Sequence, residues 1–260
     1  MMFNKVLLST AAGLVLAGAA HADGWYVSGA IGTNIQDDSS NSGSTGAFTT
    51  GNLGDGTTLD VADGTAYGWD TEFDNGTSFS AEVGRTYYDA GGYRAGLELV
   101  YSNADVDTHT DVTLGGGAIG ALDAASIASS ADPLGVTVAE VVADGRGEIT
   151  QTALFVNGYY DFNHTGTFRP YLGAGLGFAD VNVTYNPSGI GVIDDGETKF
   201  AYQLKAGATY AINESWEVFG EYAYRATDDI ETNNDLFPGT LDIENQQSAI
   251  SIGARFRFGG

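Results

Sequence analysis

The chain has 260 residues with 34 acidic and 10 basic side chains, a formal charge of −24 at pH 7, and no cysteine. The absence of cysteine excludes a disulfide framework and a thiolate metal site. So negative a charge argues against nucleic acid as a partner, because contacts to phosphates need clustered lysine and arginine. We interpret most of the acidic residues as a solvated exterior that repels like-charged neighbours.

The first 22 residues have the features of a secretory signal. Lys5 provides a positive start, residues 6–20 form a short apolar stretch, and Ala20-His21-Ala22 is a small-x-small cleavage signature with Ala20 and Ala22 as its small residues. We expect residues 1–22 to be removed and residues 23–260 to form one exported domain. No later stretch has the roughly 18 uninterrupted apolar residues of a membrane helix. A passage through a membrane would therefore require a closed β-barrel.

Eight later segments alternate apolar and polar residues with a period of two, which is the pattern of β-strands. In the third segment, Tyr93, Leu97 and Tyr101 share one face, while Arg94 and Glu98 lie on the other. A tilted membrane strand needs about 9–11 residues, and most of these segments are long enough. The predicted strands cover residues 24–32, 77–88, 93–103, 149–162, 168–183, 198–210, 216–226 and 245–258.

The connections between the predicted strands alternate in length. Short turns at 89–92, 163–167 and 211–215 alternate with long, polar segments rich in Asp, Gly and Asn, as in outer-membrane barrels with short periplasmic turns and long outer loops. The sequence therefore predicts an all-β fold: an eight-stranded antiparallel up-and-down transmembrane β-barrel with long extracellular loops. An even number of strands places both termini in the periplasm. The long loops are residues 33–76, 104–148, 184–197 and 227–244.

Aromatic residues crowd the predicted periplasmic rim, where a membrane protein has an interfacial aromatic girdle. They lie beside the short turns or the ends of the predicted barrel: Trp25, Tyr87, Tyr93, Tyr160, Phe162, Phe168, Tyr210, Trp216, Phe256 and Phe258.

The loop at 104–148 is too long for structureless chain in a compact domain. It contains a small-residue stretch at 115–130 and an apolar stretch at 136–142. We expect the third and fourth strands to extend above the membrane as a hairpin, with this insert folded on top. A ten-stranded barrel is the alternative.

Two stretches carry a family resemblance. Asn157-Gly-Tyr-Tyr-Asp-Phe162 is a tyrosine-rich strand end, and Arg169-Pro-Tyr-Leu-Gly-Ala-Gly-Leu-Gly177 has a Pro-Tyr-x-Gly-x-Gly-x-Gly pattern. The chain resembles the eight-stranded barrels of the OmpA and opacity-protein superfamily, most of all the small outer-membrane β-barrel surface proteins of Gram-negative bacteria. The resemblance implies the cell outer membrane as the location and outer-membrane lipid and lipopolysaccharide as the surroundings. Members include structural anchors, small pores, adhesins and surface antigens.

The last predicted strand is similar to the assembly signal of that superfamily, which the barrel assembly machinery reads during biogenesis. Its pattern is a polar residue, then glycine, then two aromatic residues: Ser251, Gly253, Phe256 and Phe258. Gly259 and Gly260 follow the terminal aromatic residue, so the chain departs from the usual pattern there.

Five ionisable residues on the inward faces of the predicted strands form a candidate charge network: Glu82, Glu98, Lys205, Glu221 and Arg255. The turn between the sixth and seventh strands predicts Lys205 and Glu221 as direct cross-strand neighbours of opposite charge. Glu82 falls opposite or diagonal to Glu98, and two carboxylates in a narrow interior need a proton or a cation. Arg255 is the predicted cation. The network is interpreted as a polar plug, with a salt-bridge gate on a narrow pore as the alternative.

No catalytic, cofactor or metal site is predicted, and we do not expect an enzyme. Gly173, Gly175 and Gly177 lie on one face of a continuing strand, where they make room for long side chains, rather than in a nucleotide-binding turn. His164 lies in a short turn, and His109 is interpreted as an exposed loop residue rather than a general base. The predicted function is a surface-exposed structural or interaction protein, such as a surface antigen or adhesin, with a possible extracellular or host ligand. A porin-like passive pore is the alternative, and a lipid or peptide hydrolase is a remote one.

Overall fold

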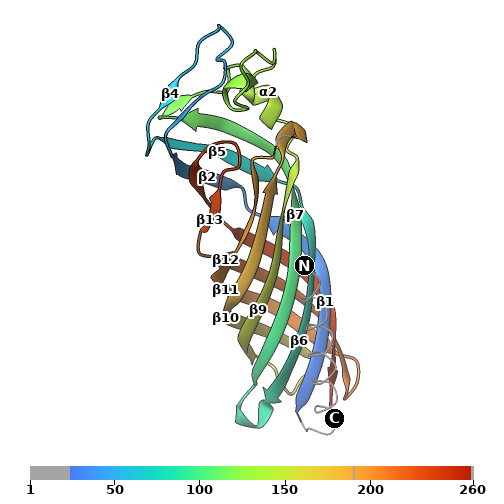
Figure 1. The fold of residues 1–260 in the computed structure, drawn as a ribbon. Coiled ribbons are helices and arrows are strands. Elements are labelled where there is room, and N and C mark those ends of the chain that lie inside the picture. The colour runs from blue at the N-terminus through green and yellow to red at the C-terminus, as the bar shows by residue number, and fades with distance from the viewer. Residues whose placement is uncertain (1–23, 190, 259–260) are drawn as a thin grey trace, which may run out of the picture.

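The computed structural model describes residues 24–189 and 191–258. Its main feature is a closed antiparallel ring of eight strands, in which β1 pairs with both β6 and β15 and so joins the two ends of the sheet. Figure 1 shows this ring as a tilted barrel below an outer group of strands. The ring consists, in order, of β1 (Trp25–Gln36), β6 (Gly76–Tyr87), β7 (Tyr93–Leu114), β9 (Gly147–Asp161), β10 (Phe168–Tyr185), β11 (Ile193–Ala211), β12 (Trp216–Thr227) and β15 (Gln246–Arg257).

The ring confirms the predicted eight-stranded barrel. The alternative of a ten-stranded barrel is wrong, because the additional strands lie outside the ring. Residues 1–22, with the predicted cleavage signature at Ala20 and Ala22, lie outside the described residues, as do Gly259 and Gly260. Among the residues that the structure describes, no helix is both long and apolar enough to cross a membrane.

The outward face of the ring is apolar because strand alternation sends aliphatic and aromatic side chains outward. Leu172, Leu176 and Phe178 on β10 are 54%, 61% and 64% exposed, while the alternate residues, Gly173, Gly175 and Gly177, turn inward. Exposed aromatic side chains gather at both rims of this apolar band, as in interfacial belts. One belt lies beside the short turns, which we call the turn end, and contains Tyr87, Tyr93, Tyr160, Phe162, Phe168, Tyr210 and Trp216; the other contains Phe79, Tyr101, Phe178, Phe200, Tyr202 and Tyr222.

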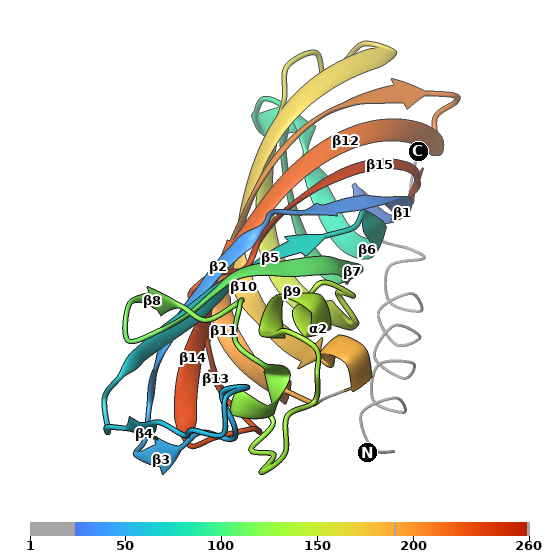
Figure 2. The same cartoon turned by 90° about the horizontal axis from the view of Figure 1, so that it is seen from above.

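Beyond the second belt, four barrel strands stop at a pair of acidic or amide residues and then continue as new strands. These pairs are Asp37-Asp38, Asp74-Asn75, Asp228-Asp229 and Glu244-Asn245. The continuations, together with the upper part of β7, form a five-stranded sheet in the order β13-β14-β2-β5-β7, which repeats the barrel order β12-β15-β1-β6-β7. We call the part beyond the second belt the cap (Figures 1 and 2). Its strands are β2 (Ser39–Thr45), β3 (Phe48–Thr49), β4 (Asp60–Val61), β5 (Ala66–Phe73), β8 (Gly117–Ala118), β13 (Ile230–Asn233) and β14 (Gly239–Ile243).

The long connections predicted at 33–76 and 227–244 are present, but they are folded rather than irregular. Both segments contain paired strands, and the order of the cap sheet follows from the barrel below it. The strands in these segments cannot be recognised from the sequence because their inward residues, such as Ser39, Asn41 and Thr71, are polar. The hydrophobic alternation that marks a strand is therefore missing.

The insert between β7 and β9 is folded, as expected for a segment too long to be structureless, and lies on top of the cap sheet. The predicted hairpin of the third and fourth strands below it is wrong, because the upper part of β7 pairs with β5 rather than with β9. It contains 3₁₀ turns at η2 (Ala124–Ser126) and the short helix α2 (Val138–Val142). A capping box starts α2, because Thr137 accepts from the backbone N–H of Glu140 while the Glu140 carboxylate accepts from that of Thr137. Two more 3₁₀ turns, η1 (Tyr88–Ala90) and η3 (Pro187–Gly189), lie in connections.

A β-bulge in β7 changes which residues face inward in the cap. Phe73 on β5 pairs with Val106, but the residue before it, Glu72, pairs with Thr108. Asp107 is therefore an extra residue on β7. One extra residue exchanges the two faces of a strand. His109 thereby turns into the interior, where its side chain is 4% exposed.

The interior changes character along the barrel. On β7 the inward residues run from Arg94 and Glu98 near the turn end to Val100, Ala104 and Val106 toward the cap. The buried apolar core consequently fills the cap side of the lumen and the cap itself. It includes Ile149, Ala153, Phe155, Ala179, Val181, Val183, Tyr185, Ile193, Ala201, Ile230, Leu241 and Ile243.

Candidate functional site

The middle of the lumen contains a cluster of three glutamates around one lysine, which we call the middle cluster. Glu82 on β6 and Glu98 on β7 are direct cross-strand partners, and the amide nitrogen of Asn157 lies 2.9 Å from a carboxylate oxygen of each. The ammonium of Lys205 lies 2.7 Å from Glu98 and 2.9 Å from Glu221. Lys205 thus joins carboxylates from two opposite parts of the wall.

Tyrosine hydroxyls complete the middle cluster. Tyr26 donates to Oε1 of Glu82 at 2.6 Å, and Tyr159 donates to its Oε2. Tyr171 donates to Glu221 at 2.8 Å. A buried carboxylate needs such donors because it has lost its water.

Lys205 and Glu221 contact each other, but the predicted register between their strands is wrong. Lys205 is paired with Ala223, and Glu221 with Gly207, so the lysine and the glutamate are diagonal rather than direct neighbours. The long lysine side chain spans that offset, which is within reach for diagonal pairs.

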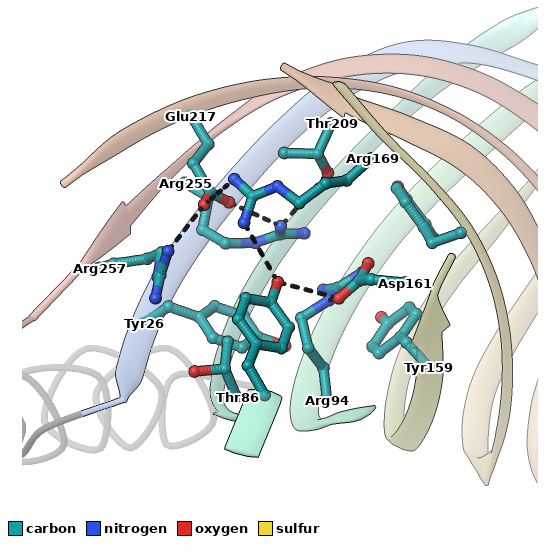
Figure 3. A network of polar contacts seen from close by, with 12 residues as sticks. Tyr26, Thr86, Arg94, Tyr159, Asp161, Arg169, Thr209, Glu217, Arg255 and Arg257 are labelled. Atoms are coloured by element: carbon teal, nitrogen blue, oxygen red, sulfur yellow. Dashed lines mark hydrogen bonds and ion pairs between the residues drawn. The ribbon is translucent and has the colours of Figure 1, made fainter. Parts of the chain in front are cut away.

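A second group of charges lies nearer the turn end, and we call it the lower cluster. Its centre is Glu217, whose carboxylate contacts Arg169 at 2.5 Å, Arg255 at 3.0 Å and Arg257 at 3.5 Å. Figure 3 shows the three guanidinium groups converging on this carboxylate, Arg169 from β10 and the other two from β15. One carboxylate therefore holds three cations in place.

The remaining part of the lower cluster is the ion pair of Arg94 and Asp161, which is 2.7 Å long and buried on both sides. Tyr88 connects the two parts, because its hydroxyl donates to Asp161 at 3.0 Å and accepts from Arg169 at 3.4 Å. The guanidinium of Arg94 also lies 4.2 Å from the ring centre of Tyr159, which is a cation–π distance.

The prediction that Arg255 joins Glu82 and Glu98 is wrong. Arg255 is directly paired with Glu217 on the neighbouring strand, and its guanidinium lies 4.9 Å from the ring centre of Tyr26. Because Tyr26 itself donates to Glu82, its ring lies between the arginine and that carboxylate. The cation that serves the glutamate pair is Lys205.

Sequence reasoning missed three residues of the lower cluster: Asp161, Arg169 and Glu217. Each is a charged residue flanked by apolar or aromatic ones at the end of a strand, as Glu217 is by Trp216 and Val218. Strict alternation to the strand ends would have placed all three in the lumen.

These clusters leave a filled interior. Glu98, Lys205 and Arg255 are 2–4% exposed, and Glu82 and Glu221 are 7% and 8% exposed. The interior of an eight-stranded ring is just wide enough to be filled by side chains. With the apolar core on the cap side, the lumen is occupied by charged pairs at one level and by packed aliphatic residues at the next.

The last strand places its four predicted signal residues on both faces. Ser251 and Gly253 face the lumen, Phe256 lies beside Trp216 with ring centres 5.0 Å apart, and Phe258 contacts Phe256. Gly253 has a local reason to be glycine, because a Cβ there would collide with the ring of Phe219.

Charge is distributed unevenly between the wall and the cap. The cap ranges 37–74, 105–148, 180–199 and 228–244 contain 26 of the 34 acidic residues but two of the ten basic ones. Within the described residues, the wall and short turns contain seven acidic and seven basic residues. The wall is therefore balanced, and the net charge of the molecule belongs to the cap.

The interpretation of His109 as an exposed loop residue is wrong. The bulge at Asp107 turns it inward, where Nδ1 lies 2.9 Å from the hydroxyl oxygen of Thr71. Burial lowers the pKa of His109 to about 4, against the opposing effect of Asp144. His164 lies in a short turn beside the ring of Tyr88. Within residues 24–189 and 191–258, no three His, Asp or Glu residues are grouped as a metal site would require.

Comparison with known proteins decides the family. Residues 33–258 match the family described as "Surface antigen". The chain belongs to this surface antigen family. "Outer membrane protein PagN" of Salmonella typhimurium is 33% identical over 84 residues, which are 30% of this chain and 35% of that protein. "Major surface antigen 4" of Anaplasma marginale is 31% identical over 135 residues, 52% of this chain and 41% of that protein. The chain thus spans well under two thirds of the length of these two relatives.

Solved structures support the fold of this surface antigen. The outer membrane protein OprG from Pseudomonas aeruginosa superposes with a TM-score of 0.51 at 16% identity, covering 92% of this chain and 99% of that protein. Together with the family match and the relative named an outer membrane protein, this fold identifies the surface antigen as an outer-membrane β-barrel.

Proposed function

We propose that this surface antigen presents its cap to the outside of the cell as an adhesin-like interaction surface, with both termini in the periplasm. The observation that carries the proposal is the contrast between a filled lumen and a large, folded, acidic cap. A barrel whose interior is occupied by ion pairs and aliphatic packing supports a role as an anchor, and the cap is then the part available to partners.

The orientation can be tested because the chain has no cysteine of its own. Thr58 is exposed in the cap, and Glu214 is exposed in a short turn. We expect T58C to react with a membrane-impermeant maleimide on intact cells, and E214C to react only after the outer membrane is permeabilised. Labelling of E214C on intact cells, with T58C protected, would overturn the orientation.

A narrow pore is the second candidate, because the middle cluster contains the kind of salt bridges that gate pores. We expect the folded protein in planar bilayers to show no reproducible unitary currents. Steady currents that change with Glu82→Ala or Lys205→Ala would instead support the pore, since both side chains lie in the middle cluster.

We also propose a chemical class for the surroundings and partners. Outer-membrane lipid and lipopolysaccharide surround the apolar band, and the barrel assembly machinery reads Ser251, Gly253, Phe256 and Phe258. An extracellular or host ligand of the cap would have a basic surface, because complementary charge speeds encounter and suppresses wrong partners. Retention on immobilised polylysine at low salt, lost at high salt, together with no retention on heparin, is the expected result.

The proposed role is not catalytic. The ring nitrogen Nδ1 of His109 is engaged by a threonine rather than by the carboxylate that orients a catalytic histidine. Lipid or peptide hydrolysis by the purified barrel that disappears in His109→Ala would contradict this part of the proposal.

A further inference from the structure

The cap contains a cavity with a volume of about 140 Å³ between its sheet and the insert that covers it. Its lining comes from the segments around residues 48–59, 67–69, 109–127 and 234–237, together with α2, Tyr185, Pro187 and Val192. It therefore lies apart from both charge clusters of the lumen. Six of its lining residues have aromatic rings: Phe48, Tyr67, Trp69, His109, Tyr185 and Phe237.

The rings pack against one another, with Trp69 between Tyr67 on one side and His109 and Tyr185 on the other. Phe48 and Phe237 are stacked with centres 4.8 Å apart, and Tyr67 meets Phe237 edge-on at 5.0 Å. His109 and Tyr185 meet edge-on at 4.8 Å. A cavity walled by ring faces and edges offers an aromatic guest the same offset and edge-to-face contacts.

Two side chains that line this cavity carry a nitrogen without a partner. Nε2 of His109 and Nε1 of Trp69 are buried and have no hydrogen-bond partner within the described part of the chain. A buried polar atom without a partner is costly, so each nitrogen would gain from a ligand atom that reaches it.

The indole N–H of Trp69 can only donate. Thr71 accepts from the amide of Asn41 at 2.8 Å, and its hydroxyl oxygen lies 2.9 Å from Nδ1 of His109, so Nε2 is the ring nitrogen without a partner in the described chain. A ligand that satisfies the indole N–H has a hydrogen-bond acceptor.

The ligand is also uncharged. The lining contains no Asp, Glu, Lys or Arg, so a charged guest would be buried without a counterion. Its size is limited as well, because an apolar cavity of about 150 Å³ in another protein holds benzene.

We propose that this cavity binds an uncharged, single-ring aromatic compound that has one acceptor oxygen, such as an aryl ketone. This site goes beyond the proposed interaction surface and does not depend on it. The aromatic walls hold the ring, and the indole N–H of Trp69 holds the oxygen.

The test uses 4′-fluoroacetophenone and fluorine NMR, with the full-length protein folded in lipid nanodiscs. We expect saturable binding that empty nanodiscs do not show. The analogue 4-fluoroethylbenzene lacks the oxygen and should bind about 5- to 10-fold more weakly, as expected for the loss of about one hydrogen bond.

Matched tryptophan variants locate the site. Trp69→Phe keeps a ring but removes the N–H, and we expect it to weaken binding of the ketone more than that of the ethyl analogue. Trp216→Phe makes the same change in the outward belt, where Trp216 is 48% exposed, and should leave binding unchanged. Equal affinities in Trp69→Phe and the unaltered protein would overturn the role of the indole.

A second variant tests the cavity itself. Ser126 lines it with a buried hydroxyl that has no partner in the described chain, so Ser126→Leu fills space without breaking a bond. Abolished binding, with the heat-modifiable gel shift retained, supports the site. Unchanged binding in Ser126→Leu, or the same signal from empty nanodiscs, would show that the ketone only partitions into lipid and would refute the proposal.

Discussion

Glu217 is the residue on which the lower cluster depends. Its side chain is 1% exposed, and Arg169, Arg255 and Arg257 each place a guanidinium nitrogen within 3.5 Å of it. Without this carboxylate the three cations would face one another in a space with little water. Removing one partner of a buried ion pair typically costs about 3–5 kcal/mol.

We therefore expect Glu217→Gln to lower the free energy of unfolding by at least about 3 kcal/mol. Glu214→Gln is the matched control, because that glutamate is exposed in the adjacent turn. Urea titration in lipid vesicles, read by the fraction that keeps heat-modifiable mobility, measures both. Equal midpoints for the two variants would show that the lower cluster contributes little to stability.

Lys205 has the corresponding position in the middle cluster, between Glu98 and Glu221. Lys205→Met removes the ion-pair partner of both carboxylates and should cost about 3–5 kcal/mol. Lys199→Met is the control on the same strand, since Lys199 is paired with Glu197 in solvent and such surface pairs contribute about 0–1 kcal/mol. If Lys205→Met and Lys199→Met unfold at the same urea concentration, the buried lysine does not hold the cluster together.

At the scale of elements, the wall was predictable and the cap sheet was not. A strand such as β10 alternates Leu and Phe with small or polar residues, so its pattern gives both its existence and its two faces. β2 is Ser-Ser-Asn-Ser-Gly-Ser-Thr, and its pairing follows from the barrel strands beneath it rather than from its own composition. Tertiary context decides such strands.

The candidate sites were also predictable in part. Face assignment from alternation places Glu82, Glu98 and Lys205 in the lumen, but partner choice there depends on strand register and on side-chain length. His109 lay beyond prediction because a single bulged residue reversed the face of its strand. Nothing in the residues around Asp107 marks that bulge.

Burial of His109 gives the cap a pH dependence. Its pKa is about 4 in the fold and about 6.5 when exposed, so the unfolded cap takes up a proton first as the pH falls. The contribution of neutral His109 to the free energy of unfolding is fully present above about pH 6.5. It decreases as the pH falls to about 4, by about 3 kcal/mol in total, and does not change further below that pH.

We expect amide hydrogen exchange in β5 and the upper part of β7 to accelerate between about pH 6.5 and pH 4, after correction for intrinsic rates. His109→Phe keeps a ring in the same place and should remove that acceleration. An identical pH profile in His109→Phe would assign the effect to other groups.

At the scale of the whole molecule, the balanced wall and the acidic cap have different electrostatic requirements. The wall and its short turns contain seven charges of each sign, most of them buried in the two clusters, whereas the cap has 26 acidic residues and only two basic ones. Such a cap is repelled by anionic surfaces over a distance that ionic strength controls.

Insertion into bilayers should therefore depend on lipid charge. When the urea-unfolded chain is diluted into vesicles, the cap must cross the bilayer, so anionic lipid should slow folding at about 10 mM salt and have little effect at about 0.5 M. Zwitterionic vesicles provide the control, and the gel shift over time gives the rate. An anionic-lipid effect that does not change with salt would exclude repulsion as its cause.

β7 alone passes from the short turn at its start into the cap sheet without a break, for 22 residues from Tyr93 to Leu114, or about 70 Å. Its lower half is paired on both sides, by β6 and β9. A pull on the cap along the barrel axis would load these ladders in shear, because their hydrogen bonds lie across the strand direction. Many bonds would then share the load at once, and β7 would act as the mechanical tether between whatever the cap holds and the membrane that anchors it.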